Sequence, residues 1–192
     1  EETLRMDQGE LFCFTNQGDL EWRIGNDPFF DLLSLGDSLF ALIREDVFSD
    51  EVEPREGRVV AIDPSTGDFL WESESFVPTT GITDFDGDII VGTSDGYIRS
   101  LASENGSVSW EQSVTSEIFH FNVDKDDDII FVSNTSGDLF AVNVDGGEEL
   151  WKLSPAEVSH FEYLDGIVYV SHYDGTVEAR DAISGQIIWS VD

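Results

Sequence analysis

The chain has 192 residues, of which 41 are Asp or Glu and 9 are Lys or Arg, so its formal net charge is −32 at pH 7. So acidic a surface excludes binding to duplex nucleic acid, because the neutralisation of phosphates requires Lys and Arg. Hydrophobic residues make up 40% of the chain and aromatic residues 12%, which excludes a disordered acidic tail and indicates a globular protein.

The acidic residues are dispersed through every segment, and Lys125 and Lys152 are the only lysines. Repulsion among so many carboxylates would destabilise a compact state in dilute buffer. At molar salt the Debye length falls to about 3 Å, and most of this repulsion disappears. The composition therefore predicts adaptation to high salt. The alternative is a polyanionic surface for a basic partner or a metal, and that alternative predicts charge in blocks.

Two further features limit the class of protein. Cys13 is the only cysteine, so the chain has neither an internal disulfide nor a cysteine zinc site. No apolar run reaches the length of about 18 residues that a membrane-spanning helix needs, so no transmembrane segment is expected. The sequence starts EETLRM with no recognisable signal peptide, and we expect either a processed leader or a longer parent protein.

In chain order, residues 1–22 contain three short β-rich runs, and residues 23–71, 72–110, 111–151 and 152–192 contain four each. The first runs of the four longer segments are FFDLLSL, TGITDF, IFHFNV and SHFEYL. Asp-Gly and Ser-Gly pairs between later runs favour hairpins, because glycine adopts the positive φ of tight turns.

Each segment is a copy of one pattern that ends in a tryptophan, with a glycine four residues earlier. The tryptophans are Trp22, Trp71, Trp110, Trp151 and Trp189, and the glycines are Gly18, Gly67, Gly106, Gly147 and Gly185. Four antiparallel strands in a repeat of about 40 residues predict an all-β fold, a β-propeller of four-stranded blades with about five repeats and an incomplete first one. A flat array or a sandwich is the alternative.

The copies AIDPSTGDFLW (61–71) and ARDAISGQIIW (179–189) share Ala, Asp, a hydroxyl residue, Gly and Trp at the same spacing. They resemble the tryptophan-docking motif of PQQ-like β-propeller repeats, which are quinoprotein-type or BamB-like, and the resemblance covers essentially the whole chain. It implies a structural docking role for the five tryptophans and the five glycines. It also implies more blades than five, so we expect residues 1–192 to be a single propeller domain or part of one. A small ring that closes by self-association through open blade edges is the alternative.

The resemblance by itself does not select a function, because such repeats occur both in quinoprotein dehydrogenases and in non-catalytic scaffolds. The dehydrogenases have a vicinal cysteine pair, which one cysteine cannot provide, and no residue matches their calcium ligands or catalytic base. We predict a non-catalytic interaction or assembly scaffold without a cofactor, and the resemblance to assembly-factor propellers implies an extracellular or envelope location. The alternatives are a portion of a dehydrogenase that binds PQQ with calcium, and a sensor module of a larger receptor or kinase.

Two acidic runs are weak candidates for a metal site, because alternating carboxylates on a turn can gather oxygen ligands for calcium. They comprise Asp84, Asp86 and Asp88 in DFDGD, and Asp124, Asp126 and Asp128 in DKDDD. An acidic hairpin turn on a salt-adapted surface is the simpler interpretation of both runs.

His120 in HFNV and His160 in HFEY occupy equivalent places on the first strand of successive copies. The first strand of a propeller blade lines the central channel, so we predict that both histidines line it, with Asp31 and Thr83 at roughly corresponding places. Two neutral imidazoles could bind a transition metal. A full metal site is not evident, and a polar lining of the channel, with water, is the simpler interpretation.

The 49-residue interval between Trp22 and Trp71 holds about ten extra residues, in the segment 44–56. Inserted loops carry function more often than the scaffold does. Phe48 and Val52 lie among carboxylates there, which suits a contact with a protein partner through this loop and the face around it. A solvated acidic loop without a partner is the equal alternative.

Overall fold

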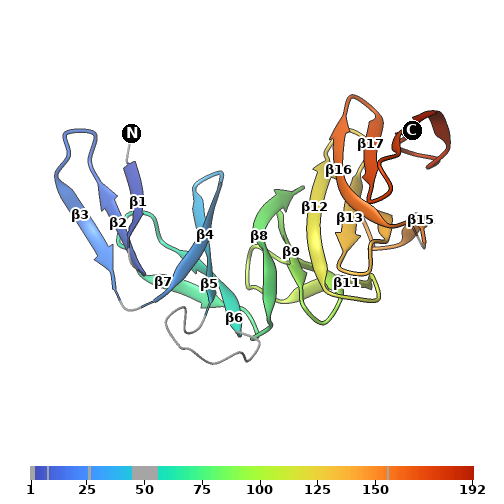
Figure 1. The fold of residues 1–192 in the computed structure, drawn as a ribbon. Helices are drawn as coiled ribbons and strands as arrows, with labels where there is room; N and C mark the ends of the chain where they lie inside the picture. The colour runs from blue at the N-terminus through green and yellow to red at the C-terminus, as the bar shows by residue number, and fades with distance from the viewer. Residues whose placement is uncertain (1–2, 8, 26, 45–55, 155) are drawn as a thin grey trace, which may run out of the picture. The chain divides into compact units, whose positions relative to one another are not determined.

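The computed structural model describes residues 3–7, 9–25, 27–44, 56–154 and 156–192, and over these ranges the chain consists of β-strands joined by turns (Figure 1). The strands form five sheets, which we number 1 to 5 in chain order. Sheet 1 has three strands, and each of the other sheets has four. No helix occurs in the described ranges, so the all-β prediction is confirmed.

The strands follow one another in each sheet in the order of the chain, so every sheet is a meander. Sheet 1 contains β1 (Thr3–Asp7), β2 (Glu10–Phe14) and β3 (Leu20–Ile24); sheet 2 contains β4 (Phe29–Leu35), β5 (Ser38–Arg44), β6 (Gly57–Ile62) and β7 (Phe69–Glu72). Sheet 3 contains β8 (Pro78–Phe85), β9 (Asp88–Thr93), β10 (Tyr97–Leu101) and β11 (Val108–Ser113). Sheet 4 contains β12 (Ile118–Asp124), β13 (Ile129–Asn134), β14 (Leu139–Asn143) and β15 (Glu149–Leu153); sheet 5 contains β16 (Val158–Leu164), β17 (Ile167–His172), β18 (Val177–Asp181) and β19 (Ile187–Val191). Neighbouring strands are antiparallel in sheets 1, 2, 4 and 5.

Asp-Gly pairs form tight turns between first and second strands. Asp86 and Gly87 have φ values of 45° and 93°, and Asp165 and Gly166 have values of 49° and 78°. Two successive residues at positive φ are the signature of the type I′ turn, whose twist matches that of the flanking strands. The local sequence thus determines where each of these hairpins reverses.

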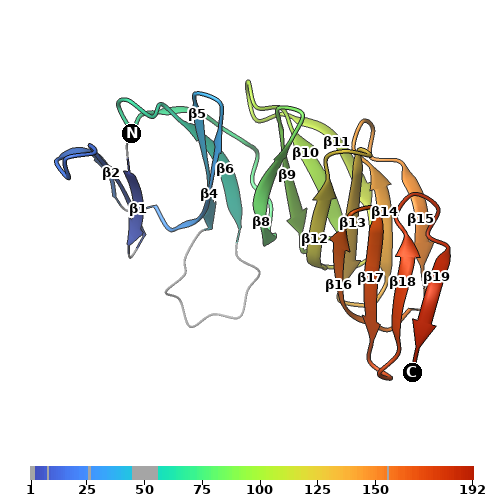
Figure 2. The ribbon, with the colours of Figure 1, turned by 90° about the horizontal axis from the view of Figure 1, so that it is seen from above.

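Burial follows the position of a strand in its sheet. Every residue of β13 is buried, because this inner strand is covered on both faces, and its sequence IIFVSN is accordingly a nearly continuous apolar run. β19, the last strand of sheet 5, is exposed along its whole length. Figure 2 shows β16, β17, β18 and β19 side by side, with β19 at the edge of the sheet.

The chain divides into two compact units: unit 1 comprises Glu1–Val91 with Ser100–Ser109, and unit 2 comprises Gly92–Arg99 with Trp110–Asp192. In unit 1, one apolar core joins sheets 1 and 2 through Leu11, Cys13, Trp22, Leu39, Ala41, Ile43, Val60 and Ile62. A second core of unit 1 includes Phe40, Leu42, Val59, Ala61, Ile82, Ile89, Val91 and Leu101. In unit 2, sheets 4 and 5 share a core of Ile129, Phe131, Leu139, Ala141, Val158, Phe161, Val168, Val170 and Ala182. That residues 1–192 form one domain stays a prediction.

The described part of the chain contains no helix of the length and apolar character that would let it cross a membrane.

Candidate functional site

The first strands of sheets 2, 4 and 5 share one irregularity near their start. The register against the second strand shifts between Phe29 and Asp31, between Ile118 and His120, and between Val158 and His160. A β-bulge of this kind inserts one extra residue and re-aims the side chains next to it. Asp31, His120 and His160 therefore occupy the same structural position.

In unit 2 this position brings two histidines together. The imidazole rings of His120 and His160 stack with centroids 5.7 Å apart and an interplanar angle of 25°. The His120 ring also lies against Phe161, and its Nε2 is buried with no hydrogen-bond partner among the described residues. His160 Nε2 lies 3.3 Å from Glu162 Oε1. The two histidines occupy equivalent positions, as predicted, and their rings are in direct contact. That they line a channel stays a prediction.

We expect His120 to titrate below 6.5, because burial lowers its pKa, the neighbouring His160 lowers it further, and Glu162 only partly opposes these effects. The unfolded chain takes up this proton near pH 6.5 and the folded chain only at lower pH, so stability that is complete above 6.5 is lost as the pH falls below it. An NMR pH titration of the imidazole signals checks the prediction, and His160→Asn should raise the His120 midpoint. A midpoint at or above 6.5, or one that His160→Asn leaves unchanged, would contradict it.

In unit 1 the same position holds Asp31, whose carboxylate ties sheet 2 to sheet 3. Asp31 Oδ1 accepts a hydrogen bond from the Leu32 N–H, and Oδ2 accepts one from the Ile82 N–H, both at 2.9 Å. A Cβ on Gly81 would overlap with Asp31 Oδ2, so the absence of a side chain at 81 makes room for the carboxylate. Thr83 lies two residues further along β8, and the residue against Asp31 is Gly81.

The first acidic run forms the turn between β8 and β9. Asp86 occupies the turn with a φ of 45°, and Asp88 Oδ2 accepts a hydrogen bond from Ser100 Oγ at 2.9 Å. Asp84 lies on β8 and is partly buried. Asp86 is therefore part of the hairpin turn, and Asp88 binds the neighbouring strand β10.

The second acidic run folds around a buried carboxylate. Asp124 is only 2% exposed, and its Oδ1 accepts a hydrogen bond from the Asp126 N–H at 2.9 Å. Asp126 and Asp128 are exposed, and Asp128 has a φ of 59°. Burial, together with hydrogen bonding to Asp124, raises the pKa of Tyr163 to about 12. Asp124 is thus part of the structure of the turn and of its contact with β16.

No group of three or more His, Cys, Asp or Glu side chains within the described ranges is arranged to hold a metal ion. His120 and His160 stack on one another, and the carboxylates of the acidic runs are distributed over turns and strands. Any metal at the six weak candidate positions stays a hypothesis.

The tryptophans pack on the glycine of the following copy. A Cβ on Gly67, Gly106, Gly147 or Gly185 would lie 2.9, 2.6, 2.6 or 2.8 Å from the indole of Trp22, Trp71, Trp110 or Trp151, respectively. In three of these contacts the indole N–H donates to the carbonyl three residues before the glycine: Pro64 at 2.6 Å, Ser103 at 2.9 Å and Ala182 at 2.8 Å. Two members of the pattern have no such contact: Trp189 is 43% exposed, and nothing lies within 4 Å of a Cβ on Gly18.

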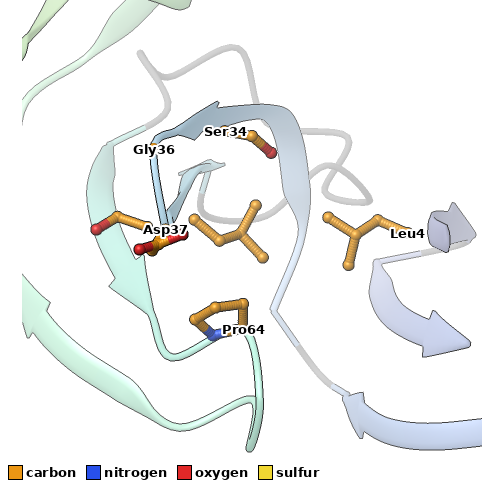
Figure 3. Close-up of a pocket in the computed structure, with 7 residues that line it drawn as sticks. Leu4, Ser34, Gly36, Asp37 and Pro64 are labelled. Carbon is orange, nitrogen blue, oxygen red and sulfur yellow. The ribbon is translucent and has the colours of Figure 1, made fainter. Parts of the chain in front are cut away.

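A pocket of about 270 Å³ lies in unit 1, next to the turn between β4 and β5. Figure 3 shows Leu4 directed from β1 toward this turn and Pro64. The lining is completed by Ser34, Gly36, Asp37, Ser38 and Leu39. This volume lies just below the range typical of small-molecule sites, and the lining provides one carboxylate and two hydroxyls.

The predicted partner loop, 44–56, lies outside the described residues except at its ends, Arg44 and Glu56. Sequence reasoning missed two exposed aromatic residues at the bulges, Phe30 (43% exposed) and Phe119 (62% exposed). The Arg44 guanidinium lies 4.4 Å from the centroid of the Phe30 ring. A signal was present in the sequence, since a Phe precedes both Asp31 and His120 in their copies.

Comparison with known protein families identifies the family to which this five-sheet architecture belongs. The family model described as outer membrane protein assembly factor BamB matches residues 7–125 and again 95–192. The chain belongs to the BamB family. The resemblance to PQQ-like, BamB-like repeats is therefore confirmed.

Curated BamB proteins are similar to the chain at low identity. The BamB of Nitrosomonas eutropha is 27% identical over 146 residues, which cover 72% of this chain and 35% of the relative. That of Shewanella oneidensis is 28% identical over 150 residues, which cover 67% of this chain and 38% of the relative. That of Yersinia pestis is 24% identical over 121 residues, which cover 54% and 31%. The chain thus spans about a third of the length of the curated BamB relatives it matches.

Solved structures support the same fold. BamB from Moraxella catarrhalis matches with a TM-score of 0.71 at 18% identity, over 95% of this chain and 55% of that one. The computationally designed protein Ika4 matches with a TM-score of 0.63 at 18% identity, over 81% of this chain and 92% of that one. The predicted fold class, a BamB-type β-propeller of four-stranded blades with an incomplete first repeat, is confirmed.

Proposed function

We propose that the chain is a non-catalytic β-propeller scaffold that takes part in protein assembly at the cell envelope of an organism that lives in high salt. The observation that carries this proposal is the match of the BamB family model to both parts of the chain, 7–125 and 95–192. The matched relatives are named as outer membrane protein assembly factors, which associates them with protein partners and with the envelope. The chain spans about a third of the length of these relatives, so its binding to a protein partner is part of the proposal.

Each of the two units has a candidate contact surface of suitable chemistry at the bulge of a first strand. Phe119 in unit 2 and Phe30 in unit 1 are exposed aromatic side chains on an acidic protein, and the half-buried Arg44 lies over the Phe30 ring. Aromatic residues and arginine are the types that dominate the energetics of protein interfaces. In sheet 2 the bulge lies beside the end of β5, because Phe29 pairs with Ile43.

Site-specific photo-crosslinking in the native cells tests this proposal. A photo-reactive amino acid in place of Phe119 should yield a discrete adduct with a protein of the envelope fraction. The matched control places the same amino acid at Leu164, which is 59% exposed at the other end of the first strand of sheet 5. If both positions give the same products, or neither gives any, the proposed surface is not a contact site.

A cofactor-dependent function makes a different prediction. A portion of a quinoprotein dehydrogenase would bind PQQ with calcium, and a scaffold would not. We propose that adding both to the chain leaves its absorbance spectrum and its melting temperature unchanged. A saturable spectral shift would favour the dehydrogenase alternative.

A further inference from the structure

Two tripeptides of the chain match the acceptor pattern for N-linked oligosaccharides, which is Asn, then any residue except Pro, then Ser or Thr. They are Asn105-Gly106-Ser107 and Asn134-Thr135-Ser136. Both have serine as the third residue, so the sequence alone does not distinguish them. The structure does, because it places the two asparagine side chains in different surroundings.

Asn105 lies in the turn between β10 and β11 of sheet 3, and both Asn105 and Ser107 are exposed. Asn105 Oδ1 accepts a hydrogen bond from the Ser107 N–H at 2.9 Å, an Asx turn that holds the amide group beside the residue with the hydroxyl. Asn105 Nδ2, the atom to which a sugar would be attached, makes no hydrogen bond to the described residues. This nitrogen is therefore accessible to an enzyme.

Asn134, at the end of β13, is only 4% exposed, and its amide group is fully used by the fold. Its Nδ2 donates to the Val114 carbonyl at 2.6 Å and to Thr115 Oγ1 at 3.5 Å, and its Oδ1 accepts from the Asp138 N–H at 3.0 Å. A sugar would replace one Nδ2 hydrogen, break one of these bonds and place bulk at a buried position. A chain with a sugar on Asn134 would therefore lose this local structure, whether transfer precedes or follows folding.

The turn itself does not require asparagine before the glycine. In four of the copies the glycine N–H donates to the carbonyl four residues earlier, at 2.8 or 2.9 Å. In the three of these copies other than 72–110, the residues on either side of the glycine are Thr66 and Asp68, Gly146 and Glu148, and Ser184 and Gln186. The same turn thus forms without the acceptor pattern, so the fold does not explain why Asn105 and Ser107 occur together.

The turn that holds Asn105 also lies away from the Phe30 surface of unit 1. Trp71, on which this turn packs, pairs through Ala61 with Phe40, in the half of β5 that adjoins the β4–β5 turn. The Phe30 bulge lies beside the other end of β5. A sugar on this turn would leave the proposed contact surface of unit 1 accessible.

We propose that Asn105 is an N-glycosylation site and that the sugar donor is an oligosaccharide linked to a lipid through phosphate. In the transfer, Asn105 Nδ2 forms a bond to the first carbon of the sugar, and the bond from that carbon to the phosphate oxygen breaks. The lipid phosphate keeps the electron pair, and a base of the transferase takes up the proton that Nδ2 loses. The proposal rests on the envelope location in the proposed function, because this modification occurs on surface loops of secreted proteins.

Mass spectrometry of the protein purified from its native cells tests the proposal. Trypsin cleaves after Lys and Arg, so cleavage after Arg99, Lys125 and Lys152 places Asn105 and Asn134 in separate peptides, 100–125 and 126–152. Peptide 100–125 should carry an oligosaccharide, and peptide 126–152 should have the mass of its unmodified sequence. Asn105→Gln should abolish the attached mass, and a circular dichroism melt verifies that this variant keeps the fold.

A matched pair of variants at Ser107 tests the need for the hydroxyl while Asn105 stays in place. Ser107→Ala should lose the oligosaccharide, and Ser107→Thr should retain it. Neither change removes the main-chain N–H that binds Asn105 Oδ1, and the side chain at 107 is exposed, so both variants should fold like the native chain.

Four results would overturn the proposal: a native peptide 100–125 without sugar, Asn105 recovered only as aspartate, a sugar that persists in Ser107→Ala, or a sugar on Asn134. The last would mean that transfer does not follow exposure in the fold. This proposal and the proposed scaffold function fail separately. Envelope adducts at Phe119 with an unmodified Asn105 overturn only the glycosylation, and a sugar on Asn105 without such adducts overturns only the contact surface.

Discussion

Replacing Trp151 with alanine is expected to lower the free energy of unfolding by about 3 kcal/mol, the lower end of the usual cost of truncating a large aromatic side chain in a core, because the indole is partly buried. The indole lies on Gly185, donates a hydrogen bond to the Ala182 carbonyl, and packs against Phe131 with ring centroids 5.9 Å apart. Its removal leaves a cavity between sheets 4 and 5 and an unpaired carbonyl. The midpoint of urea unfolding, followed by circular dichroism in molar KCl, measures the effect.

Trp189 is the matched control, because it occupies the same place in its repeat and is 43% exposed. Its replacement by alanine should cost about 1 kcal/mol or less at protein concentrations at which the chain is monomeric. Equal losses for Trp151 and Trp189 would show that the tryptophans act within their own sheets and not by packing on the next one.

The fold could be predicted from the sequence, because the conserved spacing of glycine and tryptophan in each copy follows from local backbone conformation and packing. Each glycine of the repeat either adopts a positive φ or lies against an indole, and both requirements exclude a side chain. A Gly and a Trp four residues later are therefore present in all five copies, even where the other residues differ. The exposed Trp189 and the open Gly18 could not be distinguished from their counterparts, because exposure depends on the neighbouring sheet.

The candidate site was less accessible, because it depends on strand register. The bulges at Phe30 and Phe119 shift the pairing by one residue, and counting from the sequence does not reveal such a shift. The sequence indicated Thr83 as the counterpart of Asp31, whereas Gly81 is the residue that lies against its carboxylate. A glycine within a predicted strand often marks a place where another group approaches the backbone closely. Gly81 is such a glycine, and it could have been identified from the sequence by this rule.

The acidic runs illustrate a second limit. DFDGD and DKDDD look alike as letters, but Asp124 is buried and bonded within its turn while Asp88 binds Ser100 of β10. The number of carboxylates in a run does not determine whether they converge, because convergence requires several oxygens to point at one place. Composition predicted the charge of this surface, and only the three-dimensional arrangement shows which carboxylates are structural.

Raising KCl from millimolar to molar concentration is expected to stabilise the chain strongly. With a net charge of −32, carboxylates have far more like-charged neighbours than basic partners. If each close acidic pair costs about 0.2–0.5 kcal/mol, about ten such pairs amount to about 2–5 kcal/mol. At about 2–4 °C per kcal/mol, screening them should raise the melting temperature by roughly 5–20 °C.

Two comparisons identify screening as the cause. Sucrose at equal osmolality stabilises proteins by exclusion from their surface without screening charge, so it should give a much smaller rise than KCl. The double variant Asp126→Asn, Asp127→Asn removes two exposed charges next to Asp128 and should melt higher than the native chain at low salt, with the difference fading in molar KCl. Asp124 is left intact, because its carboxylate accepts hydrogen bonds from this turn. If the melting temperature does not change with KCl, or if sucrose raises it equally, the acidic surface is not an adaptation to salt. The result would then favour the alternative of a polyanionic surface for a basic partner.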